Sequence, residues 1–176
     1  MKKHLISILL VSITLFAAEE SNGMLPSITA NPKNSEKLWH TARNASCQVE
    51  FAADAEAESL KIDNKGGGYG NYRCFLKLAP GKYTVSVTAS GKSDKSNIGL
   101  EIYSFNAKGM PRNIGMKYYP EGVLDQRELC FTFTVPQDSV RQRLALVVNG
   151  KGKVLFSKLS LVSGVPSAQS VKKKLK

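Results

Sequence analysis

The sequence predicts an all-β domain, either a two-sheet sandwich or a barrel of short antiparallel strands. Apolar and polar residues alternate over many short runs, which is the pattern of strands that bury one face. Glycine and proline separate these runs, and no long stretch shows the period of about 3.6 residues that marks a helix. The chain also contains no internal repeat, so a single domain with one core is expected.

In chain order the alternation predicts nine strands, of which 113–118 has the weakest pattern. They are 46–52, 59–62, 72–78, 83–89, 98–105, 113–118, 128–135, 143–148 and 154–161. The connections contain residues with unusual or fixed backbone angles, which we expect to end the strands. These are Gly66-Gly67-Gly68, Pro80-Gly81, Gly91, Gly109, Gly122, Pro136 and Gly150-Lys151-Gly152. The run 98–105 is apolar on both faces, which predicts a central strand or one that lines a ligand surface.

The N-terminus predicts secretion. A basic start is followed by an apolar run, 5–18, that is too short to span a bilayer, so residues 1–23 are expected to be a signal peptide. We expect an extended lead-in over 24–35, the sandwich domain over 36–163 and a basic, disordered tail over 164–176. The protein would then be secreted, periplasmic or displayed at the cell surface.

The net charge is +11, and removing the signal peptide leaves it unchanged because two lysines and two glutamates are lost. A basic surface outside the cell favours anionic partners such as acidic polysaccharides or envelope polymers, although solubility alone would also explain it. Nucleic acid is the less favoured partner, and the oligomeric state is left open.

Three cysteines follow the signal peptide, so they cannot all pair within one chain. No CxxC spacing is present, which argues against a zinc site. Alternation places Cys74 on a face with Leu76, and Cys47 on a face with Val49. A Cys47–Cys74 disulfide is therefore the best single pair, with buried free thiols as the alternative.

Few residues in the sequence could serve an enzyme active site. His40 is the one histidine after the signal peptide, and no nucleophile-elbow motif accompanies it. Asp54, Glu56 and Glu58 form a short acidic stretch that we interpret as exposed, and the glycine-rich loop lacks the Lys-Ser/Thr of a phosphate loop. The sequence therefore predicts no enzyme, no cofactor and no metal ligands.

Aromatic residues near loops and turns point instead to binding. A tyrosine ring matches the apolar C–H face of a sugar, and neighbouring polar side chains can bond the hydroxyls. Surface display is favoured for Tyr69 and Tyr72, whereas Tyr103 fits a core position and a ligand face equally.

Several segments together resemble carbohydrate-binding modules of the family 4/9/22 type. Leu78-Ala79-Pro80-Gly81-Lys82-Tyr83-Thr84-Val85-Ser86-Val87 is similar to their "L-x-P-G-K-x-Y-x-V-S" unit. The segments 98–109, 125–136 and 144–162 resemble their later strands in the same order, and Asn31-Pro32 with Trp39 is similar to their opening. The resemblance covers most of residues 31–162 and implies a jelly-roll sandwich of about eight or nine strands.

The chain departs from this family at two places. Gln126 stands where the family usually has tryptophan, and Ser157-Lys158 replaces a pair of aspartates. In the family those acids often help to hold a structural calcium. Because a lysine repels a cation, we expect no calcium here, and Lys158 would instead pair with an acid such as Glu36.

The resemblance and the aromatics together predict a secreted, non-catalytic module that binds a polysaccharide, neutral or acidic. The expected ligand-binding residues are Tyr69, Tyr72 and Tyr103 for stacking, with Arg73, Glu101 and Arg127 for hydrogen bonding. The alternative is a structural or adhesive envelope protein that binds anionic polymers through its basic surface.

Overall fold

A computed structural model describes residues 39–44, 48–54, 58–119 and 122–164. Eight strands account for most of them: β1 (His40–Arg43), β2 (Val49–Asp54), β3 (Ser59–Asn64), β4 (Tyr69–Leu76), β5 (Gly81–Asn106), β6 (Pro111–Tyr119), β7 (Gly122–Val135) and β8 (Ser139–Ser163). All pairings are antiparallel. The all-β prediction is confirmed, and in this part of the chain no helix is long and apolar enough to cross a bilayer.

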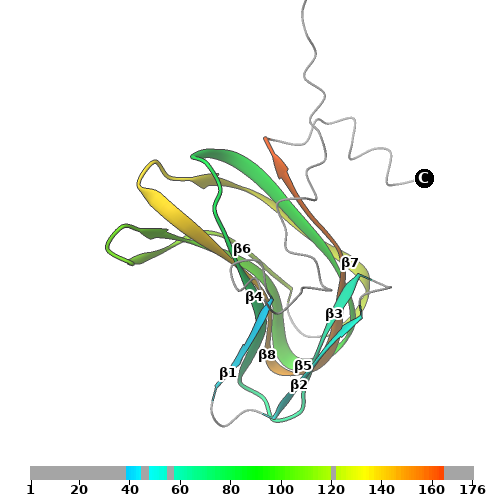
Figure 1. Ribbon diagram of the computed structural model, residues 1–176. Helices are drawn as coiled ribbons and strands as arrows, with labels where there is room; N and C mark the ends of the chain where they lie inside the picture. Colours follow the sequence, from blue (N-terminus) through cyan, green and yellow to red (C-terminus); the bar gives the residue numbers. More distant parts are fainter. Residues whose placement is uncertain (1–38, 45–47, 55–57, 120–121, 165–176) are drawn as a thin grey trace, which may run out of the picture.

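The strands form two layers that share β5 and β8. Layer A has the order β1-β4-β8-β5-β6 and uses residues 139–149 of β8 with 97–106 of β5. Layer B has the order β2-β3-β8-β5-β7 and uses 151–163 of β8 with 81–93 of β5. Figure 1 shows β5 and β8 curving from the side of β4 and β6 to that of β3 and β7. The predicted sandwich is thus built from one continuous hydrogen-bonded network.

The sequence predicted that Gly91 and the Gly150–Gly152 segment end strands. Instead, Gly91 lies within β5 and the Gly150–Gly152 segment lies within β8. Each long strand was predicted as two short ones. Gly91 adopts a φ of +137° and Gly150 a φ of +112°, which glycine adopts readily, and each lies where a strand pairing changes register: β5 with β7 at Gly91, and β5 with β8 next to Gly150. Strand β1 was missed, because its four residues, His-Thr-Ala-Arg, contain no apolar alternation. The signal peptide, the lead-in and the tail beyond Gly164 lie outside the described residues.

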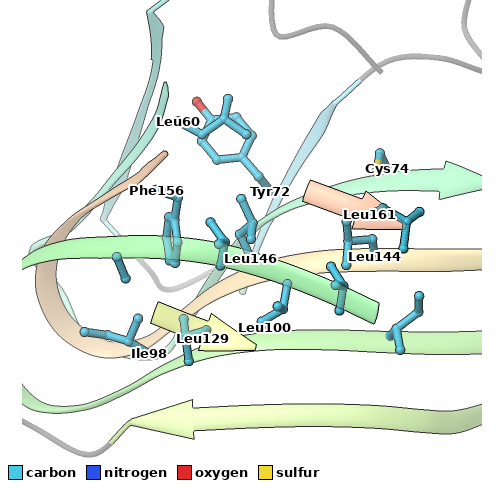
Figure 2. Close-up of a cluster of buried hydrophobic side chains, with 14 of the residues drawn as sticks. Leu60, Tyr72, Cys74, Ile98, Leu100, Leu129, Leu144, Leu146, Phe156 and Leu161 are labelled. Carbon is cyan, nitrogen blue, oxygen red and sulfur yellow. The ribbon is translucent and has the colours of Figure 1, made fainter. Parts of the chain in front are cut away.

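The core lies between the layers. Leu100, Leu144 and Leu146 of layer A are buried with Leu60 and Phe156 of layer B, and Figure 2 shows them together. Each comes from a strand in which alternate residues point inward, as the alternation predicted. Ile102 of β5 is also buried, and β5 is a central strand of both layers, in agreement with its two apolar faces.

The predicted Cys47–Cys74 disulfide is not present, because Cys74 is a free thiol. It lies fully buried among the core side chains, and this burial raises the pKa of the thiol. Cys47 lies outside the described residues. The alternative, a buried free thiol, is confirmed for Cys74.

Candidate functional site

The side of layer A that faces away from the core carries an unusual set of side chains. Where Leu100 and Ile102 of β5 point inward, the residues between and beside them point outward. The same alternation in β4, β6 and β8 adds aromatic and arginine side chains. We call this set the aromatic–arginine face; it consists of Tyr69, Arg73, Phe75, Glu101, Tyr103, Phe105, Tyr118, Arg141 and Arg143.

Two arginines of β8 alternate with three aromatic rings on this face. The Arg141 Cζ atom lies 5.0 Å from the ring centroid of Phe75 and 5.1 Å from that of Phe105. The Arg143 Cζ atom lies 4.7 Å from the Tyr103 centroid and 5.8 Å from that of Phe105. These distances are those of cation–π contacts, which hold both side chains in place.

Glu101 lies at the centre of the face and is held by two tyrosines. Its Oε2 atom accepts a hydrogen bond of 3.3 Å from the Tyr69 hydroxyl, and its Oε1 atom accepts one from the Tyr118 hydroxyl. The residue is only 4% exposed, and this burial raises the pKa of its carboxyl group against the opposing influence of Tyr69 and Arg143. Burial, followed by the charge of Glu101, likewise raises the pKa of the Tyr69 hydroxyl.

Small residues form the floor beneath these side chains. Gly99 lies directly opposite Tyr118, and a Cβ atom added there would lie 2.2 Å from the Tyr118 ring. Ala145 lies opposite Glu101 and is fully buried under the larger side chains. A glycine at position 99 therefore lets Tyr118 lie across β5 and reach Glu101.

The structure brings four of the six predicted binding residues together: Tyr69, Arg73, Glu101 and Tyr103. The other two predictions need correction. Tyr72 is 5% exposed and packs in the core, with its ring 5.1 Å from that of Phe51, so it is not available to stack on a ligand. Burial raises its pKa to about 12. Arg127 is exposed on β7 of layer B, away from this face.

Five residues of this face were not predicted from the sequence as ligand-binding: Phe75, Phe105, Tyr118, Arg141 and Arg143. The alternation of inward and outward positions along the strands could have placed most of them on this face. Phe105 shares its parity with Glu101 and Tyr103, and Arg143 directly precedes the inward-facing Leu144. What the sequence did not show is that β8 lies between β4 and β5, which brings its arginines among their aromatic rings.

The residues considered for catalysis do not come together. His40 lies on β1 of layer A, where its ring is 6.5 Å from that of Phe75. Asp54 ends β2 in layer B, and Glu58 is exposed beside β3. Glu56 is outside the described residues. Among those that are described, no group of three His, Cys, Asp or Glu side chains could hold a metal ion.

We predict that added calcium or a chelator leaves the thermal midpoint unchanged. Lys158 replaces a family carboxylate, and the structure places it exposed at a bulge of β8 with a φ of +52°. Calcium needs several oxygen ligands, usually including carboxylates. Thermal melts with millimolar calcium or EDTA provide the measurement, and a rise of several degrees with calcium contradicts the prediction. The suggested partner Glu36 lies outside the described residues.

A second prediction concerns the pH dependence introduced by Glu101. Since its pKa is raised above the ordinary value of 4.5, the stability it contributes is present below that value and is lost as the pH rises through the folded-state pKa. Glutamine keeps an uncharged acceptor for the tyrosines. As the pH rises above the ordinary value of 4.5, Glu101→Gln should therefore gain stability relative to the wild type.

Denaturant unfolding at several pH values measures this difference. Glu50 provides the control, because its exposed ion pair with Lys65, at 2.5 Å, lowers the pKa of its carboxyl group. Glu50→Gln should show a trend of the opposite sign. Parallel stability curves for Glu101→Gln and the wild type contradict the prediction.

Comparisons with known proteins support the fold. No protein-family model and no curated protein matches the sequence. A solved family 4 carbohydrate-binding module (CBM4) is similar with a TM-score of 0.55 and 14% identity, covering 82% of this chain and 99% of that one. The family 22 and family 10 glycoside hydrolase modules of a Clostridium thermocellum endo-1,4-beta-D-xylanase, complexed with xylohexaose, give a TM-score of 0.53 at 12% identity. That alignment covers 74% of this chain and 27% of the other.

A putative sugar binding protein from Bacteroides thetaiotaomicron is also similar, with a TM-score of 0.51 and 12% identity over 79% of this chain and 92% of that one. The chain thus has the fold of carbohydrate-binding modules, as its resemblance to the family 4/9/22 type predicted. At these identities the likeness shows the fold alone.

Proposed function

We propose that the protein is a secreted, non-catalytic carbohydrate-binding module whose aromatic–arginine face holds a glycan. The observation that carries this proposal is the gathering of aromatic rings from β4, β5 and β6 on one sheet face outside the core. Exposed aromatic clusters of this kind are uncommon on a domain surface without a partner. The fold that the chain shares with carbohydrate-binding modules supports the same conclusion.

The face offers both kinds of contact that a sugar needs. Tyr103 and Phe105 are partly exposed, so their rings can pack against the C–H face of a pyranose. The hydroxyls of Tyr69 and Tyr118 donate to Glu101 and keep their lone pairs, which can accept from sugar hydroxyls. Because Glu101 fixes both tyrosines, little side-chain freedom is lost on binding.

The test is retention on a panel of insoluble neutral and acidic polysaccharides, followed by calorimetry with the selected ligand. Tyr103→Ala is expected to weaken binding about tenfold, because truncating a central aromatic contact commonly costs more than about 1 kcal/mol. Leu155→Ala serves as the control, since Leu155 is 38% exposed but lies on layer B. Retention on no polysaccharide, or unchanged binding by Tyr103→Ala, contradicts the proposal.

A second candidate, an adhesive protein that binds anionic envelope polymers, is favoured by a hollow on layer B. Lys61, Lys92 and Lys153 line this open hollow of about 500 Å³ together with Ser90 and Leu155. Lys92 and Lys153 are directly opposite each other on β5 and β8, and Asp63 of β3 lies opposite Lys153 on its other side. Because three lysines line the hollow beside this one acid, its charge favours an anionic ligand. This candidate predicts binding that falls steeply with salt and is lost in a Lys92→Gln/Lys153→Gln variant but not in Tyr103→Ala.

A further inference from the structure

We infer that the aromatic–arginine face selects glycans that carry carboxylate groups, that is, chains of uronate residues, over neutral glycans. This inference rests on the proposed function and specifies its ligand. It depends on the two arginines of β8 that contact the aromatic rings and on Arg73 of β4.

The face presents guanidinium groups together with its aromatic rings. Arg141 lies near Phe75 and Phe105, and Arg143 lies near Tyr103 and Phe105. Each of these three rings therefore has a guanidinium group within cation–π distance. A ligand that packs against one of these rings would also meet a charged hydrogen-bond donor beside it.

The two arginines of β8 offer planar groups of hydrogen-bond donors. A guanidinium is planar and carries its donors in that plane, and contacts with aromatic rings restrict where the side chain lies. A carboxylate can accept two parallel hydrogen bonds from one edge of a guanidinium, whereas a sugar hydroxyl cannot form the same charged, bidentate pair. The ring contacts thus hold Arg141 and Arg143 on the face where a planar anion can bind them.

The face carries more positive than negative charge. None of the three arginines forms an ion pair with a described carboxylate. Glu101, the acid at the centre, already accepts hydrogen bonds from Tyr69 and Tyr118 at its two oxygens. Arg73 and Arg143 are partly buried, where an opposite charge interacts more strongly than in bulk water, and Arg141 is exposed to a ligand.

Two of the arginines contain a buried donor with an unmet hydrogen bond. The Nε atoms of Arg73 and Arg143 are buried and have no hydrogen-bond partner among the described residues. A buried charged donor without an acceptor is unfavourable. Because both Nε atoms are shielded, a carboxylate would have to bind the outer nitrogens of these guanidinium groups, and its charge would offset part of the cost of burying them.

The experiment is calorimetry of the full chain with short oligomers of galacturonate, mannuronate and glucuronate, each paired with its methyl ester. The ester keeps the sugar ring and hydroxyls but removes the charge. Near physiological salt, at least one free acid should bind about tenfold or more tightly than its ester. Neutral cello-, xylo- and galacto-oligosaccharides are measured in parallel.

Two double variants locate the binding. Arg141→Gln/Arg143→Gln should lose about tenfold or more of the affinity for the acid, whereas Lys92→Gln/Lys153→Gln, which removes the same charge from layer B, should stay within about twofold. Arg141→Lys/Arg143→Lys keeps the charge and should still lose several-fold, because lysine lacks the planar fork. This third variant also tests the inference if the glutamine variant does not fold.

The outcomes separate the inference from the proposed function. If acids and esters bind equally, or only neutral oligosaccharides bind, the inference is overturned while glycan binding stands. If no glycan binds, both are overturned. Two further results also overturn the inference, because binding would then depend on surface charge alone. One is an equal loss of affinity in Arg141→Gln/Arg143→Gln and in Lys92→Gln/Lys153→Gln. The other is full affinity in Arg141→Lys/Arg143→Lys.

Discussion

Gly91→Ala is expected to lower the free energy of unfolding by about 3 kcal/mol or more, combining left-handed backbone strain with a steric clash. Gly91 has a φ of +137°, and a Cβ atom there would lie 2.1 Å from the carbonyl oxygen of Lys153. Since that atom belongs to the backbone of β8, only a shift of the strand can relieve the clash. The residue lies in the layer B part of β5, opposite Val154 of β8 and at a shift of register with β7, so such a shift would disturb the pairing of β5 with both strands.

Gly122→Ala is the matched control. Gly122 has a similar φ of +131°, but no atom of the residues that the structure describes lies within 4 Å of the added Cβ atom. The free energy of unfolding of Gly122→Ala should fall by about 1–2 kcal/mol, which is the cost of backbone strain alone. Chemical denaturation of both variants measures the difference. Equal losses would show that the close approach of β5 and β8 at Gly91 does not contribute to stability.

Tyr72→Ala should lower the free energy of unfolding by about 3–5 kcal/mol, as truncation of a buried aromatic side chain usually does. The Tyr72 ring packs against Phe51, and Figure 2 shows it within the cluster of buried side chains to which Leu60 also belongs. The cavity left by alanine would lie where layer A meets layer B.

Tyr69→Ala, three residues earlier on the same strand, is the contrasting variant. Tyr69 lies on the opposite face of β4 and contacts Glu101 rather than the core. We expect it to lose only about 1 kcal/mol of stability, since one hydrogen bond and partial burial are removed, but to lose most of its glycan affinity. A reversed pattern, with Tyr69→Ala the less stable variant, contradicts the assignment of the two faces.

The two tyrosines also show what the sequence could predict. Tyr72 has the parity of Cys74 and Leu76, which the alternation placed inward, so its burial was present in the pattern. The position beside a glycine-rich loop outweighed that pattern and led to a surface assignment. Alternation was the better guide, because one face of every strand in a sandwich is buried.

Other features depend on pairing between distant strands, which alternation does not reveal. Arg143 and Tyr103 are neighbours only because β8 pairs with β5, and Phe75 joins them because β8 also pairs with β4. The continuity of β5 through Gly91 was missed for a related reason. A glycine that ends a strand and one that bends it look the same in a single sequence, since both supply a positive φ.

The most direct test of the central claim is an amide chemical-shift map, recorded by titrating the ¹⁵N-labelled protein with the polysaccharide fragment that the retention panel selects. The predicted result is a single cluster of shifted amides in β4, β5 and β8 that includes Tyr69, Tyr103 and Arg143, with those of Lys61 and Lys92 unmoved. A cluster confined to the lysine hollow of layer B, with the aromatic–arginine face unchanged, would contradict the account.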